Sequence, residues 1–372
     1  MSTTARSRNG SRPSGPRALG EHVLAYIGRG PALHPLGVVG WRAGAYRRRG
    51  PDRRPFFLRW LEDLRRGPRR AFSRHESRTG VRVAGAAAVP VAVALASLRK
   101  RLRLPASAAI AIACAAPLGA IAATKPRTRT RYIAAGAAYM WLFKVSWEIP
   151  FDEPEKLRRR LHVDYPIAID RLLGGGVTPT QRLQRVLRRS GRVSLLDKAV
   201  TVVYGSWFLP HLLLAYVLLR DERYVPRAAG RLTAAYHLTT PFYWLVPTAP
   251  PWWASQHGGR MDGEVDRVVR AVVCNVLGIE PPENSEGPGN PWGSMPSDHI
   301  SSAAITAMGL SEVGPVYGAI GWTYVAAAGF AVVYLGEHYL VDVLAGLAVA
   351  EVVRMLEPHA APLLRAVAHA LE

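Results

Sequence analysis

The feature that most constrains this chain is a succession of apolar blocks of membrane-crossing length, separated by short arginine-rich segments. A helix needs about 20 apolar residues to cross the hydrocarbon core of a bilayer. With 372 residues, 49% of them hydrophobic, and a net charge of +21, the chain is explained better by spans packed into one bundle than by several soluble domains. The sequence therefore predicts an all-α, polytopic transmembrane helical bundle. The predicted spans lie at about 83–98, 104–124, 131–147, 199–219, 228–247, 297–311, 315–335 and 339–356.

The N-terminal segment, residues 1–80, has the composition of a disordered tail. It is rich in Pro, Gly, Ser and Arg and lacks a sustained helical apolar period. Its arginine clusters are expected to hold it near anionic lipid on the cytoplasmic side. Similar clusters occur in nucleic-acid-binding proteins, but no signature of such a fold accompanies them, so nucleic acid is not an expected partner. No apolar core with a small-residue cleavage site precedes the first span, which predicts that the span is retained.

The connection at residues 150–198 is polar and amphipathic, which predicts one or two helices lying at the membrane interface. Arginines between residues 220 and 231 mark one turn as cytoplasmic, because short cytoplasmic connections carry an excess of Lys and Arg. Eight spans with both ends inside then place residues 296–299 and 338 outside. The basic stretch from Arg158 to Arg192 falls on that same outer side, against the rule, and we assign it to lipid headgroups or substrate phosphate.

The segment Pro296-Ser297-Asp298-His299 stands at the predicted start of one span. Proline costs no hydrogen bond at a helix start, and the free amides there attract an anion. Ser297 adds a hydroxyl donor, and His299 lies in the first turn, where an imidazole is able to protonate the leaving oxygen of a bound phosphate. A histidine near a membrane surface is, however, more often an interfacial cap than a catalyst.

The segment Gly336-Glu337-His338-Tyr339 precedes the last span, with Asp342 four residues after His338. On a helix, residues four apart share a face, so the carboxylate is able to accept a hydrogen bond from the ring. That bond would fix the tautomer and leave the other ring nitrogen to attack phosphorus. A structural hydrogen-bonded pair is the alternative of equal weight. About two membrane crossings separate His299 from His338, which predicts that both imidazoles return to one surface.

These residues resemble the superfamily of type 2 phosphatidic acid phosphatases and related lipid phosphotransferases. Its second motif, Pro-Ser-x-His, is matched by Pro296, Ser297 and His299, and its third motif ends in His-x-x-x-Asp, matched by His338 and Asp342. The resemblance covers the chain from about residue 131 onward. It implies a phosphohistidine at His338, orientation of that ring by Asp342, and protonation of the leaving group by His299. It implies no metal ion and no cofactor.

Two cations of the superfamily are missing from their usual positions. The third motif usually begins with Ser-Arg, but here Ala331 and Val332 fill those positions, and no lysine begins the first motif, which is Lys, six residues, then Arg-Pro. The inositol phosphorylceramide synthase-like branch is more similar, because it also lacks the arginine. It shares an Ala-Pro-Pro-Trp-like motif, matched by residues 249–252.

Two further residues are candidates for substrate binding. Trp252 follows prolines that should exclude a helix, in a segment that is either a plain interfacial turn or a wall of the lipid-phosphate site. Lys144, near the outer end of its span, is a possible replacement cation, although a lysine at this depth also reaches the interface for solvation alone.

The predicted fold is thus a six-helix phosphatase-like core with two extra N-terminal spans. The predicted domains are a basic cytoplasmic tail at 1–80, two additional transmembrane helices at 81–130, the membrane catalytic domain at 131–357 and a C-terminal tail at 358–372.

The predicted function is metal-independent transfer of a phosphoryl or phosphodiester group from a lipid phosphate, at the outer face of the cell membrane. The acceptor is water or an alcohol such as inositol, and the sequence does not separate these two; the other expected partners are membrane lipids. The oligomeric state is not predicted. The alternative function is a catalytically silent membrane scaffold or transporter that retains the bundle, which the two missing cations favour. A vanadate-dependent haloperoxidase ranks last, since those enzymes are soluble and need those cations.

Overall fold

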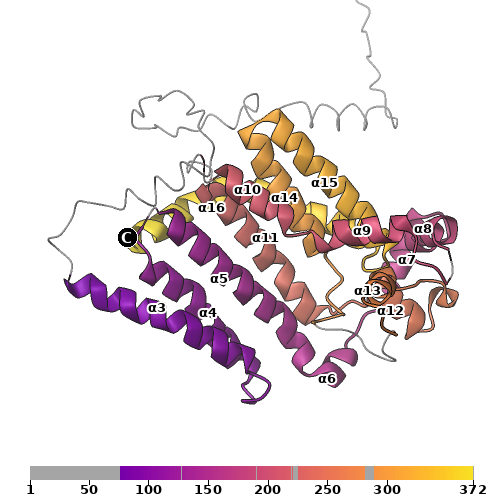
Figure 1. Ribbon diagram of the computed structural model, residues 1–372, viewed down its shortest axis with the longest axis horizontal. Helices are drawn as coiled ribbons and strands as arrows, with labels where there is room; N and C mark the ends of the chain where they lie inside the picture. Colours follow the sequence, from indigo (N-terminus) through magenta and orange to yellow (C-terminus); the bar gives the residue numbers. More distant parts are fainter. Residues whose placement is uncertain are drawn as a thin grey trace, which may run out of the picture.

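In the computed structural model, the described residues are 76–126, 128–189, 191–218, 220, 225–280 and 289–371. This part of the chain forms α-helices, labelled α3 to α16 as in Figure 1, and contains no β-strand. The prediction of an all-α fold is therefore confirmed over these residues. The predicted disorder of the N-terminal tail falls almost wholly outside them.

Three long helices open the described chain and lie side by side in the order α3, α4, α5 (Figure 1). They are α3 (Glu76–Ser97), α4 (Ala106–Ala123) and α5 (Arg129–Glu148). α3 and α4 approach closely because small residues meet at their contact: a Cβ added at Gly119 would lie 2.7 Å from the carbonyl oxygen of Gly85. Close approach of small residues is a usual device for packing helices in lipid.

Short helices occupy the connection that was predicted to lie at the interface. They are α6 (Pro154–Arg158), α7 (Asp164–Leu173) and α8 (Pro179–Leu187). α9 (Leu195–Gly205) and α10 (Leu209–Leu218) then follow as one broken helix, bent by 48°. The single span predicted at 199–219 is thus two helices with a break between them.

α11 (Val225–Leu245) leads into a second polar connection that carries α12 (Pro251–Gln256) and α13 (Val268–Leu277). The expectation that prolines exclude a helix around Trp252 is wrong. Pro251 occupies the first turn of α12, where its missing N–H costs no hydrogen bond. In Figure 1, α7, α8, α12 and α13 gather at one end of the bundle.

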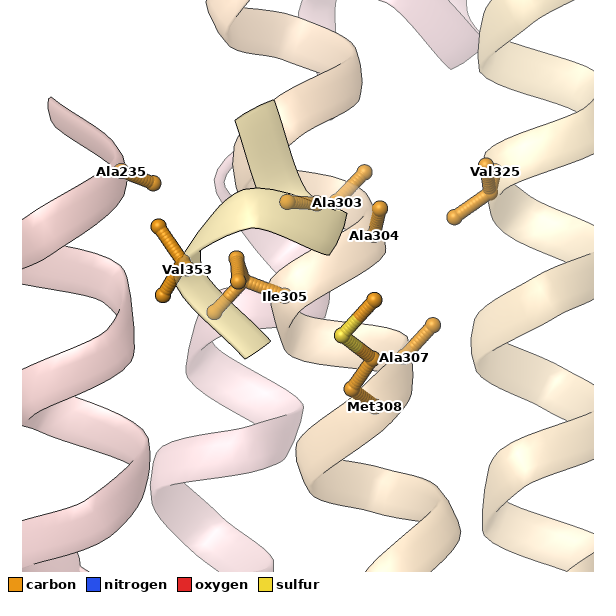
Figure 2. Close-up of a cluster of buried hydrophobic side chains, with 9 residues drawn as sticks. Ala235, Ala303, Ala304, Ile305, Ala307, Met308, Val325 and Val353 are labelled. Atoms are coloured by element: carbon orange, nitrogen blue, oxygen red, sulfur yellow. The ribbon is translucent and has the colours of Figure 1, made fainter. Parts of the chain in front are cut away.

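The core forms around α14 (Asp298–Val313), whose residues from Ile300 to Leu310 are all buried. α15 (Pro315–Tyr334), α16 (Leu340–Leu371) and α11 pack around it. Figure 2 shows Ala235 of α11, Val325 of α15 and Val353 of α16 around the small side chains of α14. α16 continues well past its predicted end near residue 356.

Three helices among the described residues are long and apolar enough to cross a membrane, and the bent pair α9–α10 makes a fourth if it is one span. The three are Thr79–Ser97, Ala106–Ala123 and Pro315–Tyr334. Large apolar side chains such as Leu118 and Val316 are exposed on their surfaces, as expected for helices that face lipid. These features agree with a multi-pass membrane protein. The division into six core helices and two extra spans stays a prediction.

A cluster of ion pairs joins three helices at the C-terminal end of α14. Arg231 of α11 is 5% exposed and lies 2.7 Å from Glu312 of α14 and 2.6 Å from Glu357 of α16, measured between nitrogen and oxygen atoms. Arg227 pairs with the same two carboxylates but is half exposed. A buried ion that loses its partner is costly, whereas an exposed pair contributes little.

We therefore expect Arg231→Met to destabilise the bundle by about 3 kcal/mol, because it leaves two mostly buried carboxylates with one exposed partner. Arg227→Met, the matched control, should cost less than about 1 kcal/mol. The free energy of unfolding in detergent, followed by circular dichroism, measures both. Equal losses in the two variants would contradict the assignment of Arg231 as the central residue.

Candidate active site

The two predicted motifs meet where α14 and α16 begin. A Cβ added at Gly346 of α16 would lie 2.5 Å from the carbonyl oxygen of Ser297, so only glycine permits this approach. Next to it, the backbone N–H of Ser297 donates to the backbone carbonyl of Asp342 over 3.1 Å. The starts of the two helices are thus locked together through backbone atoms.

This contact brings the two imidazoles side by side. The ring centroids of His299 and His338 are 5.5 Å apart, with the rings inclined at 69°. His338 is 5% exposed, and its Nδ1 lies 3.3 Å from Oδ2 of Asp342. Because Nδ1 faces the carboxylate, Nε2 is the ring nitrogen left for other chemistry.

Asp342 is fully buried and held from three sides. Its Oδ2 accepts a hydrogen bond from the Ser294 hydroxyl and another from the backbone N–H of Tyr339 over 3.0 Å. The Ser294 hydroxyl also lies 3.5 Å from Nδ1 of His338. A carboxylate fixed in this way fixes in turn the orientation of the histidine ring.

His299 is enclosed by aromatic rings at the break between α9 and α10. Tyr204 stacks on it with a centroid distance of 4.8 Å, and Trp207 meets it edge-on at 5.8 Å. Trp207 also contacts His211, whose Nδ1 lies 3.4 Å from the Thr306 hydroxyl. The bend in the predicted span is thus the place where the bundle accommodates this histidine.

Unpaired polar atoms surround the start of α14. The Ser297 hydroxyl and Oδ2 of Asp298 are buried and have no hydrogen-bond partner among the described residues. Together with the free amides at the helix start, the Ser297 hydroxyl provides donors for an anion. The carbonyl oxygen of Pro296 accepts a hydrogen bond from the Tyr243 hydroxyl over 2.8 Å, which fixes this segment to α11.

The two remaining candidates lie in different surroundings. Trp252 is fully buried, and its backbone N–H donates to the carbonyl of Gly336 over 3.0 Å, directly before the His338 turn. Lys144 is 63% exposed and pairs with Glu148 one helical turn later, so its described ion pair does not reach either histidine.

Asp170 of α7 holds the start of α16 from outside and was not predicted. Its two carboxylate oxygens accept the backbone N–H groups of Leu340 and Val341 over 2.9 and 2.8 Å. These amides have no partner within the helix, so Asp170 acts as an N-terminal cap from another part of the chain. Burial raises the pKa of Asp170 to about 6, although the two amide donors oppose this rise.

Several residues of the site were not predicted from the sequence, because no motif or pattern marks them. Ser294 and Asp170 are isolated polar residues outside the motifs, and Tyr204 and Trp207 read as ordinary residues of an apolar span. In the sequence, Asp170 is distinguished only as a carboxylate within a basic, amphipathic stretch. Over the described residues, no group of three or more His, Cys, Asp or Glu is arranged to hold a metal ion.

Comparison with known proteins gives one finding. The family model described as PAP2 superfamily matches residues 167–356, which include both histidines, Asp342 and Asp170. No curated protein and no solved structure matches the chain. The matched region begins in α7 and ends within α16, so it leaves out α3, α4 and α5.

The raised pKa of Asp170 leads to a pH-dependent stability. Because the folded protein holds this proton more tightly than the unfolded chain, stability should fall as pH rises from about 4 to about 6. Asp170→Asn should remove this component of the pH profile and, through loss of one cap bond, cost about 1 kcal/mol. Thermal unfolding of both proteins across this pH range is the measurement. A profile unchanged by the substitution would contradict the pKa assignment.

Proposed function

The chain belongs to the PAP2 superfamily, and on that premise we propose that it is a membrane enzyme that transfers a phospho-group from a lipid through a phosphohistidine at His338. The observation that carries the proposal is the convergence of three side chains. His338 lies against both His299 and the buried Asp342, beside the start of α14. A scaffold or transporter has no need of such a constellation.

In the first step, Nε2 of His338 attacks phosphorus and the bond from phosphorus to the lipid oxygen breaks. Asp342 holds Nδ1 of the ring and stabilises the positive charge that develops on it. His299, the adjacent imidazole, donates a proton to the leaving oxygen. The start of α14, including the hydroxyl of Ser297 and the turn at Pro296, binds the non-bridging oxygens.

In the second step, an acceptor hydroxyl attacks the phosphohistidine, and the bond from phosphorus to nitrogen breaks. His299 takes the proton of that hydroxyl, which returns both histidines to their starting state. The scheme uses no metal ion and no cofactor. Water as acceptor gives hydrolysis, and an alcohol gives transfer.

An alcohol acceptor such as inositol is the form of the reaction that we favour. Support comes from the resemblance of the segment Ala249–Trp252 to the inositol phosphorylceramide synthase-like branch, which also lacks the arginine that is missing here at position 332. Trp252 lies fully buried and donates its backbone N–H to Gly336, close to the turn that carries His338, which supports a role for this segment near the site. We place the site at the outer face of the cell membrane, where the exposed Lys144 contacts lipid headgroups.

Trapping of the adduct tests the proposed nucleophile. Labelled lipid phosphate should form an acid-labile adduct with the wild-type chain. His338→Ala should form no adduct, because no other side chain takes over the attack. Asp342→Asn should form the adduct about 1000-fold more slowly. Rapid quench with labelled phosphatidic acid and phosphatidylinositol, with and without free inositol, measures both and identifies the acceptor. Turnover that survives His338→Ala would reject His338 as the nucleophile, and a wild-type chain without turnover or adduct would leave the scaffold.

The role of His299 is tested by leaving-group dependence. His299→Gln should lower the rate by about 1000-fold for a lipid alcohol, which needs a proton as it leaves. For a p-nitrophenyl leaving group the loss should shrink to about tenfold, because that oxygen leaves without protonation. Single-turnover rates on the two substrate types give the comparison. The same loss on both would show that His299 acts in some other way.

A further inference from the structure

The site contains a cation that the superfamily motifs do not predict. We propose that Arg267 binds the substrate phosphate, and that its pairing with Glu337 makes the site selective for a singly charged phosphodiester. This inference rests on the proposed function and adds the substrate class to it. Arg267 precedes α13 and lies far in sequence from both histidine motifs.

The first support is the position of Arg267 beside the His338 turn. Its Nε lies 3.1 Å from Oε1 of Glu337, the residue directly before His338. The charges of Arg267 and Glu337 both act on the hydroxyl of Tyr204, whose ring stacks on His299 at 4.8 Å. The guanidinium is therefore tied to the residue directly before His338.

The second support is a built platform that holds the guanidinium in place. Its carbon atom lies 4.1 Å from the ring centroid of Trp252, and stacking of this kind suits arginine better than lysine. The platform is rigid, because Trp252 is fully buried and donates its backbone N–H to Gly336. On the other side, the backbone N–H of Val268 donates to the carbonyl of Leu335 over 3.3 Å.

This arrangement explains two features that the sequence left open. The segment Ala249–Trp252 supports Arg267 through the ring of Trp252 and needs no contact with the lipid. The position filled by Val332, where the superfamily places an arginine, is 1% exposed and packs in the apolar core, so no cation stands there. Arg267 brings a guanidinium to the same turn from a different helix. Its side chain is 20% exposed and pairs with Glu337.

The charges near the histidines indicate which phosphate fits. Asp342 lies against His338, and Glu337 pairs with Arg267. Two carboxylates thus lie beside His338 and this arginine. A phosphomonoester carries close to two negative charges at neutral pH, because its second pKa is about 6, whereas a phosphodiester carries one. The acidic surroundings therefore penalise the monoester.

The test uses two lipids that differ by one methyl group and one charge, phosphatidic acid and phosphatidylmethanol. Full-length protein in detergent should release diacylglycerol from phosphatidylmethanol with the higher kcat/KM. Arg267→Met should lower that kcat/KM by about 100-fold, and Arg267→Lys should fall between, since lysine keeps the charge without the bidentate geometry. Arg260→Met, which removes an exposed arginine paired with Asp164, is the matched control and should stay within about twofold.

Two further measurements separate this inference from the proposed function. Orthovanadate, a phosphate mimic, should stabilise the wild type and the Arg260→Met variant against heat, and should need about 100-fold higher concentration to stabilise Arg267→Met. This readout does not depend on turnover and also reports whether the variant folds. Glu337→Gln should shift the kcat/KM ratio about tenfold toward phosphatidic acid, because it removes one negative charge.

Three results would overturn the inference while leaving the phosphohistidine untouched. They are equal vanadate responses of the two methionine variants, a wild-type preference for phosphatidic acid, and an unchanged substrate ratio in Glu337→Gln. Absence of the acid-labile adduct on His338, by contrast, would reject the proposed function even if Arg267 binds vanadate.

Discussion

The site depends on one backbone contact between the first turns of α14 and α16. The missing side chain at Gly346 lets the carbonyl of Ser297 approach α16, and the N–H of Ser297 donates to the carbonyl of Asp342. The positions of both imidazoles depend on this contact, because His299 lies in the first turn of α14 and His338 lies just before α16 begins. A lipid-embedded core supplies little hydrophobic force between helices, so close packing of small residues and specific polar contacts must position them.

The polar connections between the long helices supply further contacts that hold the site together. Asp170 from α7 caps α16, and Trp252 from α12 carries Arg267 against the His338 turn. Gln184 of α8 adds a hydrogen bond from its Nε2 to the carbonyl of Tyr334 over 2.8 Å, at the end of α15. Segments that the sequence marks only as polar and amphipathic thus determine the shape of the site.

Long apolar runs and the two histidine motifs could be predicted because both are local signals. Helix positions follow from runs of apolar residues, and His338 and Asp342 share a helix face by spacing alone. The remaining site residues could not be predicted, since their contacts join distant parts of the chain. Asp170 meets Leu340, and Arg267 meets Trp252 and Glu337, through tertiary packing that leaves no periodic trace. The break at Ser206–Phe208 was also missed, because the two halves together have the length and composition of one span.

α16 is fixed at two points along its axis by polar groups from other helices. Asp170 holds its first amides, and Arg231 holds Glu357 more than four turns later. A smooth apolar helix in lipid can slide along its neighbours with little change in contact energy, so packing alone sets its axial position weakly. The two polar anchors remove that freedom, and they fix the height of His338 relative to the neighbouring helices.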